Sequence, residues 1–231
     1  MGERSCISVL HHVEVAFHGL AERTAGEVKA VALPPLGEDL RELGPGQDDL
    51  ALDAGRQPQR LLTFLGVAPG MRVLELGAGG GYTTELLARI VGPDGAVYGQ
   101  NSQFILERFA EAPWSKRLLK PVMGNVTRLD QNFDAPFPPE AHDLDMVLNV
   151  LFYHDTVWQG VDRDAMNKSV FDALESGGIY GIIDHSAREG AGATETESLH
   201  RIEESLVKAE VEKAGFVLQD QADFLRNPDD T

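Results

Sequence analysis

The stretch from Val73 to Leu87, VLELGAGGGYTTELL, places four glycines within five positions directly after a short apolar run. Glycine loses more conformational freedom on folding than any other residue, so such a cluster needs a geometric reason, for example a positive φ angle or a ligand against the backbone. The apolar residues before the glycines are typical of a buried strand, and Tyr82 to Val91 after them are typical of a helix. We therefore predict a glycine turn from a strand into a helix, with a ligand close to its backbone.

Strands and helices alternate along the rest of the chain. The predicted strands are Met71–Leu76, Ala96–Gly99, Leu118–Met123, Asp145–Leu151, Ile179–Ile183 and the last extended segment Phe216–Leu225. The predicted helices are Gln57–Leu65, Tyr82–Val91, Ser102–Ala112, Asp162–Ser176 and Ser205–Ala214. Strands separated by helices in this order form parallel pairs with right-handed crossovers. We therefore predict an α/β fold with a doubly wound, mostly parallel Rossmann-like sheet and helices on both faces, spanning residues 56–231.

Residues 1–55 have a different character, because Pro34-Pro35 and Gly44-Pro45-Gly46 interrupt short apolar groups. We expect an N-terminal helical and loop extension there.

The charge of the chain excludes one large class of partner. There are 37 acidic and 20 basic side chains, which gives a formal net charge of -17. This charge repels a phosphate backbone and removes the attraction on which most nucleic-acid affinity depends. No apolar run approaches the roughly 20 residues needed to span a bilayer. We expect no nucleic acid and no membrane as partner.

Cysteine usage limits the chemistry further. The only cysteine is Cys6, so an intrachain disulfide and a cysteine metal cluster are excluded. A single thiol fits a reducing compartment, and we expect a cytoplasmic protein.

The spacing of the glycines argues against two common cofactors. A dinucleotide fingerprint has the form Gly-x-Gly-x-x-Gly, but the position of its third glycine is taken here by Tyr82. The Gly-Lys-Ser/Thr ending of a nucleoside triphosphate loop is also missing from Gly77–Tyr82. NAD and ATP are therefore disfavoured.

The arrangement of a strand, Glu75-Leu76-Gly77-Ala78-Gly79-Gly80-Gly81 and a helix resembles motif I of the class I S-adenosylmethionine-dependent methyltransferases. The resemblance covers roughly Pro69 to Leu225 and includes the segments LESGGIYGIID and VEKAGFVL. It implies S-adenosylmethionine as cofactor and S-adenosylhomocysteine as product. It further implies cofactor contacts from the loop, which are Glu75 toward the methionine amino group and Gly77, Ala78, Gly79, Gly81 and Tyr82 around it.

Two positions depart from the pattern of that superfamily. An acidic residue usually ends the second strand and binds the ribose hydroxyls, whereas this chain has Gln100-Asn101. Another acidic residue often follows the third strand and contacts the adenine amine, whereas we place Asn125 and Val126 there. An asparagine carbonyl can accept part of these hydrogen bonds, so we assign Asn101 to the ribose and Asn125 to the adenine. A turn residue in a left-handed conformation explains either asparagine equally well.

The reacting groups are expected on the loops that follow the fourth and fifth strands. Asn149 would contribute its carbonyl to the methionine amino group, with Tyr153 and His154 facing the substrate. The fifth strand ends in Asp184-His185. Because histidine titrates near neutrality, His185 is our first choice of general base and His154 the second, with Asp184 beside them as a third catalytic candidate.

A glycine-rich loop from Ser186 to Ala193 precedes a short predicted helix, Glu195–Arg201, and could act as a lid. His200 and Arg201 would then lie near the substrate. A divalent metal would need clustered carboxylates, and no spacing in the sequence compels Asp155 and Asp184 to provide them, so we predict no metal.

The sequence thus predicts methyl transfer from S-adenosylmethionine to an oxygen or nitrogen of a small molecule. Nucleic-acid or glutamine methylation is disfavoured because Asn149-Val150-Leu151-Phe152 lacks the two prolines of the Asn-Pro-Pro-Tyr type of motif. Two alternatives stay open: an enzyme that performs another reaction on the same cofactor, and a non-catalytic cofactor-binding module.

The end of the sheet poses a separate question. The superfamily normally closes its sheet with an antiparallel seventh strand, yet only Arg226 to Thr231 follow Leu225. An unpaired edge is an association hazard. We therefore predict a truncated chain, a strand supplied by residues 1–55, or a homodimer.

Overall fold

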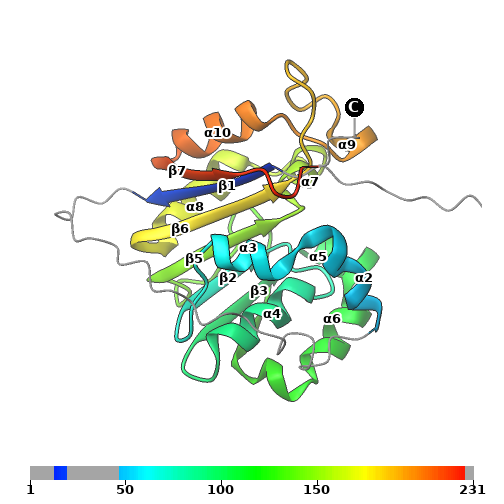
Figure 1. The fold of residues 1–231 in the computed structure, drawn as a ribbon, viewed down its shortest axis with the longest axis vertical. Coiled ribbons are helices and arrows are strands. Elements are labelled where there is room, and N and C mark those ends of the chain that lie inside the picture. The colour runs from blue at the N-terminus through cyan, green and yellow to red at the C-terminus, as the bar shows by residue number, and fades with distance from the viewer. Residues whose placement is uncertain (1–12, 20–46, 227–231) are drawn as a thin grey trace, which may run out of the picture.

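The computed structural model describes residues 13–19 and 47–226 of the chain (Figure 1). Within these residues seven strands form one sheet in the order β4-β3-β2-β5-β6-β1-β7. The strands are β1 (Val13–Gly19), β2 (Arg72–Leu76), β3 (Ala96–Asn101), β4 (Val126–Asp130), β5 (Leu144–Val150), β6 (Leu174–Asp184) and β7 (Phe216–Ala222). Each neighbouring pair from β4 to β6 is parallel.

Helices cover the sheet on both faces, with α3 in front of it and α8 behind it in the view of Figure 1. The longer helices are α2 (Gln47–Arg56), α3 (Pro58–Phe64), α4 (Tyr82–Val91), α6 (Glu111–Leu118), α8 (Arg163–Ala173) and α10 (Glu204–Lys213). The short ones are α5 (Gln103–Ile105), the π-helix η1 (Leu106–Ala110), the 3₁₀-helix η2 (Pro121–Asn125), α7 (Tyr153–Trp158) and α9 (Thr196–Leu199). The predicted doubly wound α/β fold is confirmed.

The strand predicted at Leu118–Met123 is wrong. That segment is the end of α6 followed by η2, and the strand is β4, Val126–Asp130. Pro121 stands in the first turn of η2, where its fixed φ suits a helical turn. β4 lies at the edge of the sheet, so its polar side chains Thr127 and Asp130 can remain exposed.

Strand β1 lies antiparallel between β6 and β7 (Figure 1). Val13 pairs with Asp184 and His18 with Ile179 on one side, and Gly19 pairs with Phe216 on the other. The expectation of a helical and loop extension at residues 1–55 is therefore corrected at this segment, which is a strand. Of the three predicted solutions for the sheet edge, the structure contains the strand from residues 1–55. The rest of that range outside 13–19 and 47–55 lies beyond the described residues.

The glycine turn is packed against a buried indole. Trp114 of α6 is fully buried, and a Cβ atom at Gly81 would lie 2.2 Å from its ring. Gly99 of β3 meets the same ring, where a Cβ atom would lie 2.7 Å away. Only glycine at both positions lets α6 approach the strands closely, and this contact fixes the turn relative to the sheet.

No helix in the described part of the chain is long and apolar enough to cross a membrane.

Candidate cofactor and substrate site

The glycine turn from Gly77 to Gly81 lies between the end of β2 and the start of α4. Three of its residues have positive φ angles, which are 66° at Gly77, 54° at Gly79 and 81° at Gly81. A side chain strains such a conformation, which explains the three glycines physically. Two amides from the end of β3 hold the turn: Gln100 Oε1 accepts from the Gly77 N–H at 3.1 Å, and Asn101 Oδ1 accepts from the Gly79 N–H at 2.8 Å.

A cavity of about 330 Å³ opens beside this turn. It is lined by loop, strand and helix residues that include Glu75, Gly77, Gly79, Tyr82, Leu151 and Phe152, and by Asp49, Leu52 and Arg56 of α2. Glu75 is 3% exposed, and Thr84 donates a hydrogen bond to its carboxylate. Burial raises the pKa of Glu75 to about 7 despite the hydrogen bonds from Thr84 and Thr83. The lining of the cavity therefore includes a buried carboxyl group whose pKa lies near neutrality.

A second cavity, of about 470 Å³, lies at the carboxyl ends of β3 and β4. Its lining includes Ser102, Phe104, Asn132, Phe133 and Trp158. Phe133 stacks on Phe152 of the first cavity with ring centroids 4.7 Å apart. Because Phe152 also lies against Gly77, the stacked pair forms a wall between the two cavities.

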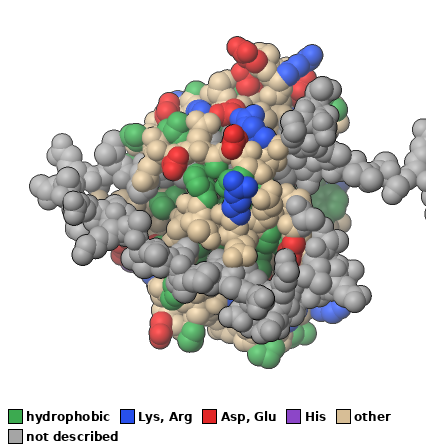
Figure 2. All heavy atoms as spheres, in the orientation of Figure 1, with side chains coloured by type: hydrophobic (Ala, Val, Ile, Leu, Met, Phe, Trp, Pro, Cys, Tyr) green, Lys and Arg blue, Asp and Glu red, His purple; other side chains and the backbone are tan. Residues whose placement is uncertain are grey.

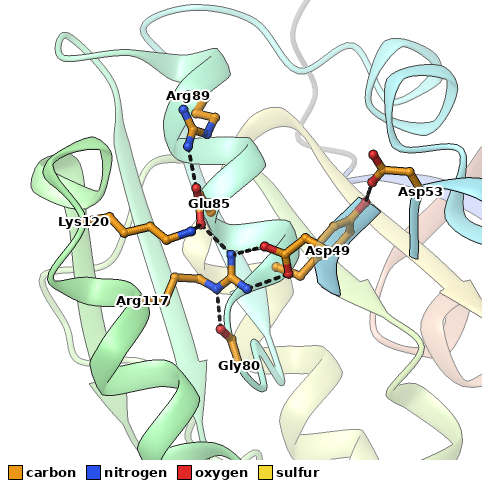
Figure 3. Close-up of polar contacts among 8 residues, drawn as sticks. Asp49, Asp53, Gly80, Glu85, Arg89, Arg117 and Lys120 are labelled. Atoms are coloured by element: carbon orange, nitrogen blue, oxygen red, sulfur yellow. Dashed lines mark hydrogen bonds and ion pairs between the residues drawn. The ribbon is translucent and has the colours of Figure 1, made fainter. Parts of the chain in front are cut away.

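Helix α2 is attached to this region by ion pairs (Figure 3). Arg117 of α6 donates to both carboxylate oxygens of Asp49 at 2.8 and 3.1 Å, to Glu85 of α4 at 2.5 Å and to the Gly80 carbonyl at 2.7 Å. Tyr82 donates its hydroxyl hydrogen to Asp53. One guanidinium thus links the N-terminal helix, the glycine turn and α4.

Glu85 is the centre of the same network. Arg89, Arg117 and Lys120 each contact its carboxylate, and its side chain is only 3% exposed. Burial alone would raise the pKa of Glu85, but these three hydrogen bonds hold the pKa below its ordinary value. The charged form is thereby fixed at the start of the helix that follows the glycine turn.

Histidines and carboxylates gather where β5 and β6 end. His154 is 3% exposed, and its Nδ1 lies 2.5 Å from Asp184 Oδ1 while its Nε2 lies 3.1 Å from Asp155 Oδ1. Asp184 also accepts from the backbone N–H groups of His154 and His185. Burial would lower the pKa of His154, but the hydrogen bonds to Asp155 and Asp184 outweigh it and raise the pKa to about 9. The rings of His185 and His200 lie 5.7 and 5.4 Å from that of His154.

The known proteins that this chain resembles are methyltransferases. Residues 55–124, which contain the glycine turn, match the family model of protein-L-isoaspartate(D-aspartate) O-methyltransferase. The protein-L-isoaspartate O-methyltransferase of Methanothermobacter thermautotrophicus is 38% identical over 99 residues, 43% of this chain and 42% of that protein. The ubiquinone/menaquinone biosynthesis C-methyltransferase UbiE of Shewanella halifaxensis is 30% identical over 122 residues, 52% of this chain and 45% of that protein. The chain spans less than half the length of both relatives.

The fold is similar to that of a solved S-adenosylmethionine-dependent methyltransferase from Aquifex aeolicus. The TM-score is 0.56 at 20% sequence identity, and the match covers 77% of this chain and 87% of that chain. Both the sequence around the glycine turn and the fold are thus similar to those of S-adenosylmethionine-dependent methyltransferases. The superfamily inferred from the glycine turn is thereby confirmed.

In this class I methyltransferase fold, the predicted loop residues Glu75, Gly77, Ala78, Gly79, Gly81 and Tyr82 lie together around the turn. Asn101 is fully buried, and its amide binds both the N–H and, at 3.1 Å, the carbonyl of Gly79. Asn101 therefore supports the loop from below, and its contact with a ribose stays a prediction.

The assignment of Asn125 and Val126 to the adenine is wrong. Asn125 precedes β4 and donates to the carbonyls of Ala88 at 3.0 Å and Gly92 at 2.8 Å, at the far end of α4 from the glycine turn. The residues that follow β4 are instead Asn132 and Phe133, which line the larger cavity. These two residues could not be recognised from the sequence, because the predicted strand Leu118–Met123 lies too early in the chain.

Tyr153 is also corrected. Its side chain is fully buried, donates to Glu210 Oε2 at 2.9 Å and accepts from Asn167 Nδ2 at 2.8 Å. It therefore joins α7 to α8 and α10 and does not face a substrate. Asn149 pairs with Leu76 in the sheet and is fully buried, and neither atom of its amide has a hydrogen-bond partner among the described residues.

The loop from Ser186 to Ala193 is tied to the chain beyond α9. Ala187 N–H donates to the Ile202 carbonyl at 2.9 Å, and Gly192 N–H donates to Glu203 Oε2 at 2.7 Å. Arg201 donates to the Ser186 carbonyl at 3.3 Å. His200, at the end of α9, reaches Asp155 at 3.3 Å and thereby joins the histidine cluster. Of the two residues predicted near the substrate, the structure brings His200 to His154.

Proposed function

We propose that this protein binds S-adenosylmethionine at the glycine turn and transfers its methyl group to an oxygen or nitrogen of a small molecule. The observation that carries the proposal is the cavity beside Gly77–Gly81, which is lined by residues of the glycine turn and by Glu75, whose carboxyl group is buried. Ligands of parallel α/β sheets bind outside the carboxyl ends of the strands, which is where this cavity lies.

The residues present fit the cofactor. A carboxyl group with a pKa near 7 gains charge when an ammonium group approaches, so Glu75 suits the methionine end. Asn132 and Phe133 in the larger cavity supply the amide and aromatic face that a purine needs. The two cavities meet at Phe133 and Phe152, so an extended cofactor would occupy both after the Phe152 ring moves. When bound, S-adenosylmethionine supplies an electrophilic methyl group.

The acceptor would approach from the side of α7 and β6. Both ring nitrogens of His154 already face carboxylates, so His154 is poorly placed to accept a proton from a substrate. His185, whose backbone N–H is fixed by Asp184, is the better candidate for a general base. Asp184 acts as a positioning residue for both histidines.

Two features support a small acceptor. Helix α2 contributes Leu52 and Arg56 to the wall of the cofactor cavity, and a cover of this kind favours a small molecule over a folded macromolecule. On the face shown in Figure 2, basic side chains lie among acidic and apolar ones, an arrangement that does not favour a phosphate backbone. The two relatives differ in the reaction they are named for, since one is a protein-L-isoaspartate O-methyltransferase and the other a C-methyltransferase of ubiquinone/menaquinone biosynthesis.

Calorimetric titration with S-adenosylhomocysteine tests the proposal, with NADH as the negative control. We expect one site, and we expect Asn101→Ala to weaken binding at least tenfold because the Gly79 peptide loses its support. Asn125→Ala is the matched control, because this asparagine also binds two backbone groups but lies away from the cavity. Equal loss in both variants, or no binding by folded and ligand-free wild type, would contradict the proposal.

A further inference from the structure

His154, Asp155 and His200 point toward one another at the end of β5 and α9. The ligand atoms that they offer all lie within 4.8 Å of one another. His154 Nε2 is 3.1 Å and His200 Nδ1 is 3.3 Å from the same oxygen, Asp155 Oδ1. Ligands at about 2.0–2.2 Å from a tetrahedral metal ion are separated by roughly 3.3 Å, so two of the three edges already have the length of a coordination polyhedron.

We propose that these three residues bind a divalent transition-metal ion, with zinc as the best match. Two imidazole nitrogens and one carboxylate oxygen form a donor set that suits zinc and neighbouring first-row ions better than magnesium or calcium, which prefer oxygen alone. Three protein ligands leave at least one position for water or a substrate atom, as in zinc sites that act on substrates. The site reverses the expectation, drawn from sequence, that the chain binds no metal.

The groups behind the three ligands have the arrangement that metal sites require. A ligating histidine usually donates its second ring N–H to a carboxylate, which fixes the tautomer and the ring orientation. Asp184 does this for His154: its Oδ1 lies 2.5 Å from Nδ1 and leaves Nε2 directed at Asp155. Trp158 donates its indole N–H to Asp155 at 2.7 Å, which orients the second ligand.

The third ligand is held by an unusual backbone conformation. His200 has φ 54° and ψ 46°, the left-handed region that side chains other than glycine rarely adopt. Arg201 N–H donates to the Glu195 carbonyl at 3.4 Å and Ile202 N–H to the His185 carbonyl at 2.9 Å, so the chain is tied on the far side of His200. Strained residues of this kind concentrate at binding sites, because the surrounding structure must compensate for the strain.

The charge of the cluster also fits a dication. Asp155 is 20% exposed and Asp184 only 5% at the side chain, so two carboxylates face the same histidine with little water around them. An ion of charge +2 would neutralise both. His200 is 60% exposed and provides an open side through which an ion can enter.

The site lies next to the cofactor cavity, because Phe152, which lines that cavity, is two residues before His154. An ion at this place would face the acceptor side of the cleft and could hold an acceptor oxygen or nitrogen. This role rests on the proposed methyl transfer, whereas the binding of the ion does not.

The test uses the full chain after dialysis against a chelator, with zinc alone and cobalt alone as probes. Titration with zinc should give one site per chain, and cobalt should give the visible absorption bands of a low-coordinate ion with nitrogen ligands. His200→Ala and Asp155→Asn should each weaken zinc binding at least tenfold. His142→Ala is the matched control, because His142 is equally exposed and also lies beside an aspartate, 2.8 Å from Asp143, outside the cluster.

These measurements distinguish a metal site from a simple ion-pair cluster. Loss of zinc affinity in the two cluster variants, with wild-type affinity in His142→Ala, supports the site. Absence of a stoichiometric site in the wild type, or binding that His200→Ala leaves unchanged, overturns it and makes the cluster an ion pair of His154 with its two carboxylates. Since His200 is exposed, its replacement should not unfold the chain, and a thermal unfolding curve checks this. Failure of S-adenosylhomocysteine to bind would contradict the proposed function, whereas the metal titrations would still show whether the three residues bind zinc.

Discussion

Glu75 shows how one buried side chain connects the fold with the proposed function. It lies one residue before the end of the central strand β2, and desolvation there raises the pKa of its carboxyl group to about 7. A structural role alone would be served by an apolar residue, because burying a titratable group reduces stability. This loss of stability is consistent with a carboxyl group that becomes charged when a cationic ligand binds.

The stability of the protein should therefore depend on pH through Glu75. Its pKa is raised from the ordinary value of 4.5 to about 7, so between these values the folded state holds a proton that the unfolded state has released. The free energy of unfolding then falls as pH rises through this window. At 1.36 kcal/mol per pKa unit the loss is at most about 3 kcal/mol.

Glu75→Gln should remove this dependence. Urea denaturation of both proteins from pH 4 to pH 8 measures the difference, and other titrating groups cancel in it. The variant should gain stability relative to wild type between pH 4.5 and 7 and hold the gain above that range. Parallel curves for the two proteins would contradict the burial argument.

Gly77 and Gly79 provide a matched pair for the geometry of the turn. A Cβ atom at Gly77 would lie 2.6 Å from the Phe152 ring, whereas at Gly79 the nearest atom is 4.0 Å away. Both have positive φ angles, so alanine costs about 1–2 kcal/mol at either position. Overpacking adds about 1–3 kcal/mol at Gly77 alone. Urea denaturation should rank Gly77→Ala as the less stable variant, and equal losses would show that Phe152 does not lie against the turn.

At the residue scale, the sequence predicts those features that depend on residues close together in the chain. The positions of Gly77, Gly79 and Gly81 follow from their spacing after a strand. The contact between His154 and Asp184 joins residues 30 positions apart and depends on the register of β5 with β6, so only its edge of the sheet could be predicted. Tyr153 does not share the direction of His154, because successive side chains on a helix point about 100° apart.

Among the elements, α2 is the one that the structure adds to the site. The sequence predicts a helical and loop extension for residues 1–55 but does not place it at the site, because the docking of α2 depends on Arg117, which lies 68 positions from Asp49. The edge strand β4 was misplaced for a different reason. Its side chains Thr127 and Asp130 are exposed, so the run lacks the apolar pattern that identified the central strands.

The attachment of α2 can be tested by Asp49→Asn. This change weakens the two hydrogen bonds from Arg117, whose side chain is 15% exposed, and should lower the free energy of unfolding by about 1–3 kcal/mol. Hydrogen exchange should also accelerate in the backbone of α2. Glu111→Gln is the control, because its ion pair with Arg128 is more exposed to water and should contribute much less to the free energy of unfolding. Equal effects of the two changes would mean that α2 is not fixed by Arg117.

On the scale of the whole molecule, the sheet is completed by a strand from the N-terminal part of the chain. β1 takes the antiparallel position between β6 and β7, so all seven strands of the described chain have partners. The edge that the sheet would otherwise expose already indicates the need for such a strand. The position of β1 could not be predicted, because one short apolar run among several gives no sign of its pairing.

The insertion of β1 predicts slow hydrogen exchange for the N–H groups of residues 13–19. They should exchange at least as slowly as those of β7, because β1 has a partner strand on each side whereas the edge strand β7 pairs with β1 alone. Mass spectrometry of peptides from the labelled protein measures this. Exchange of residues 13–19 within seconds, with β6 protected, would show that β1 is not part of the sheet in solution.

The central claim is that the glycine turn holds the methyl donor, and a crystal structure with S-adenosylhomocysteine bound tests it most directly. We predict the methionine end beside Glu75 and the glycine turn, and the adenine between Ser102, Asn132 and Phe133, with the Phe152 ring displaced from Gly77. Two results would contradict this claim: a ligand bound elsewhere, or a Phe152 ring that stays against Gly77 at saturating ligand concentration.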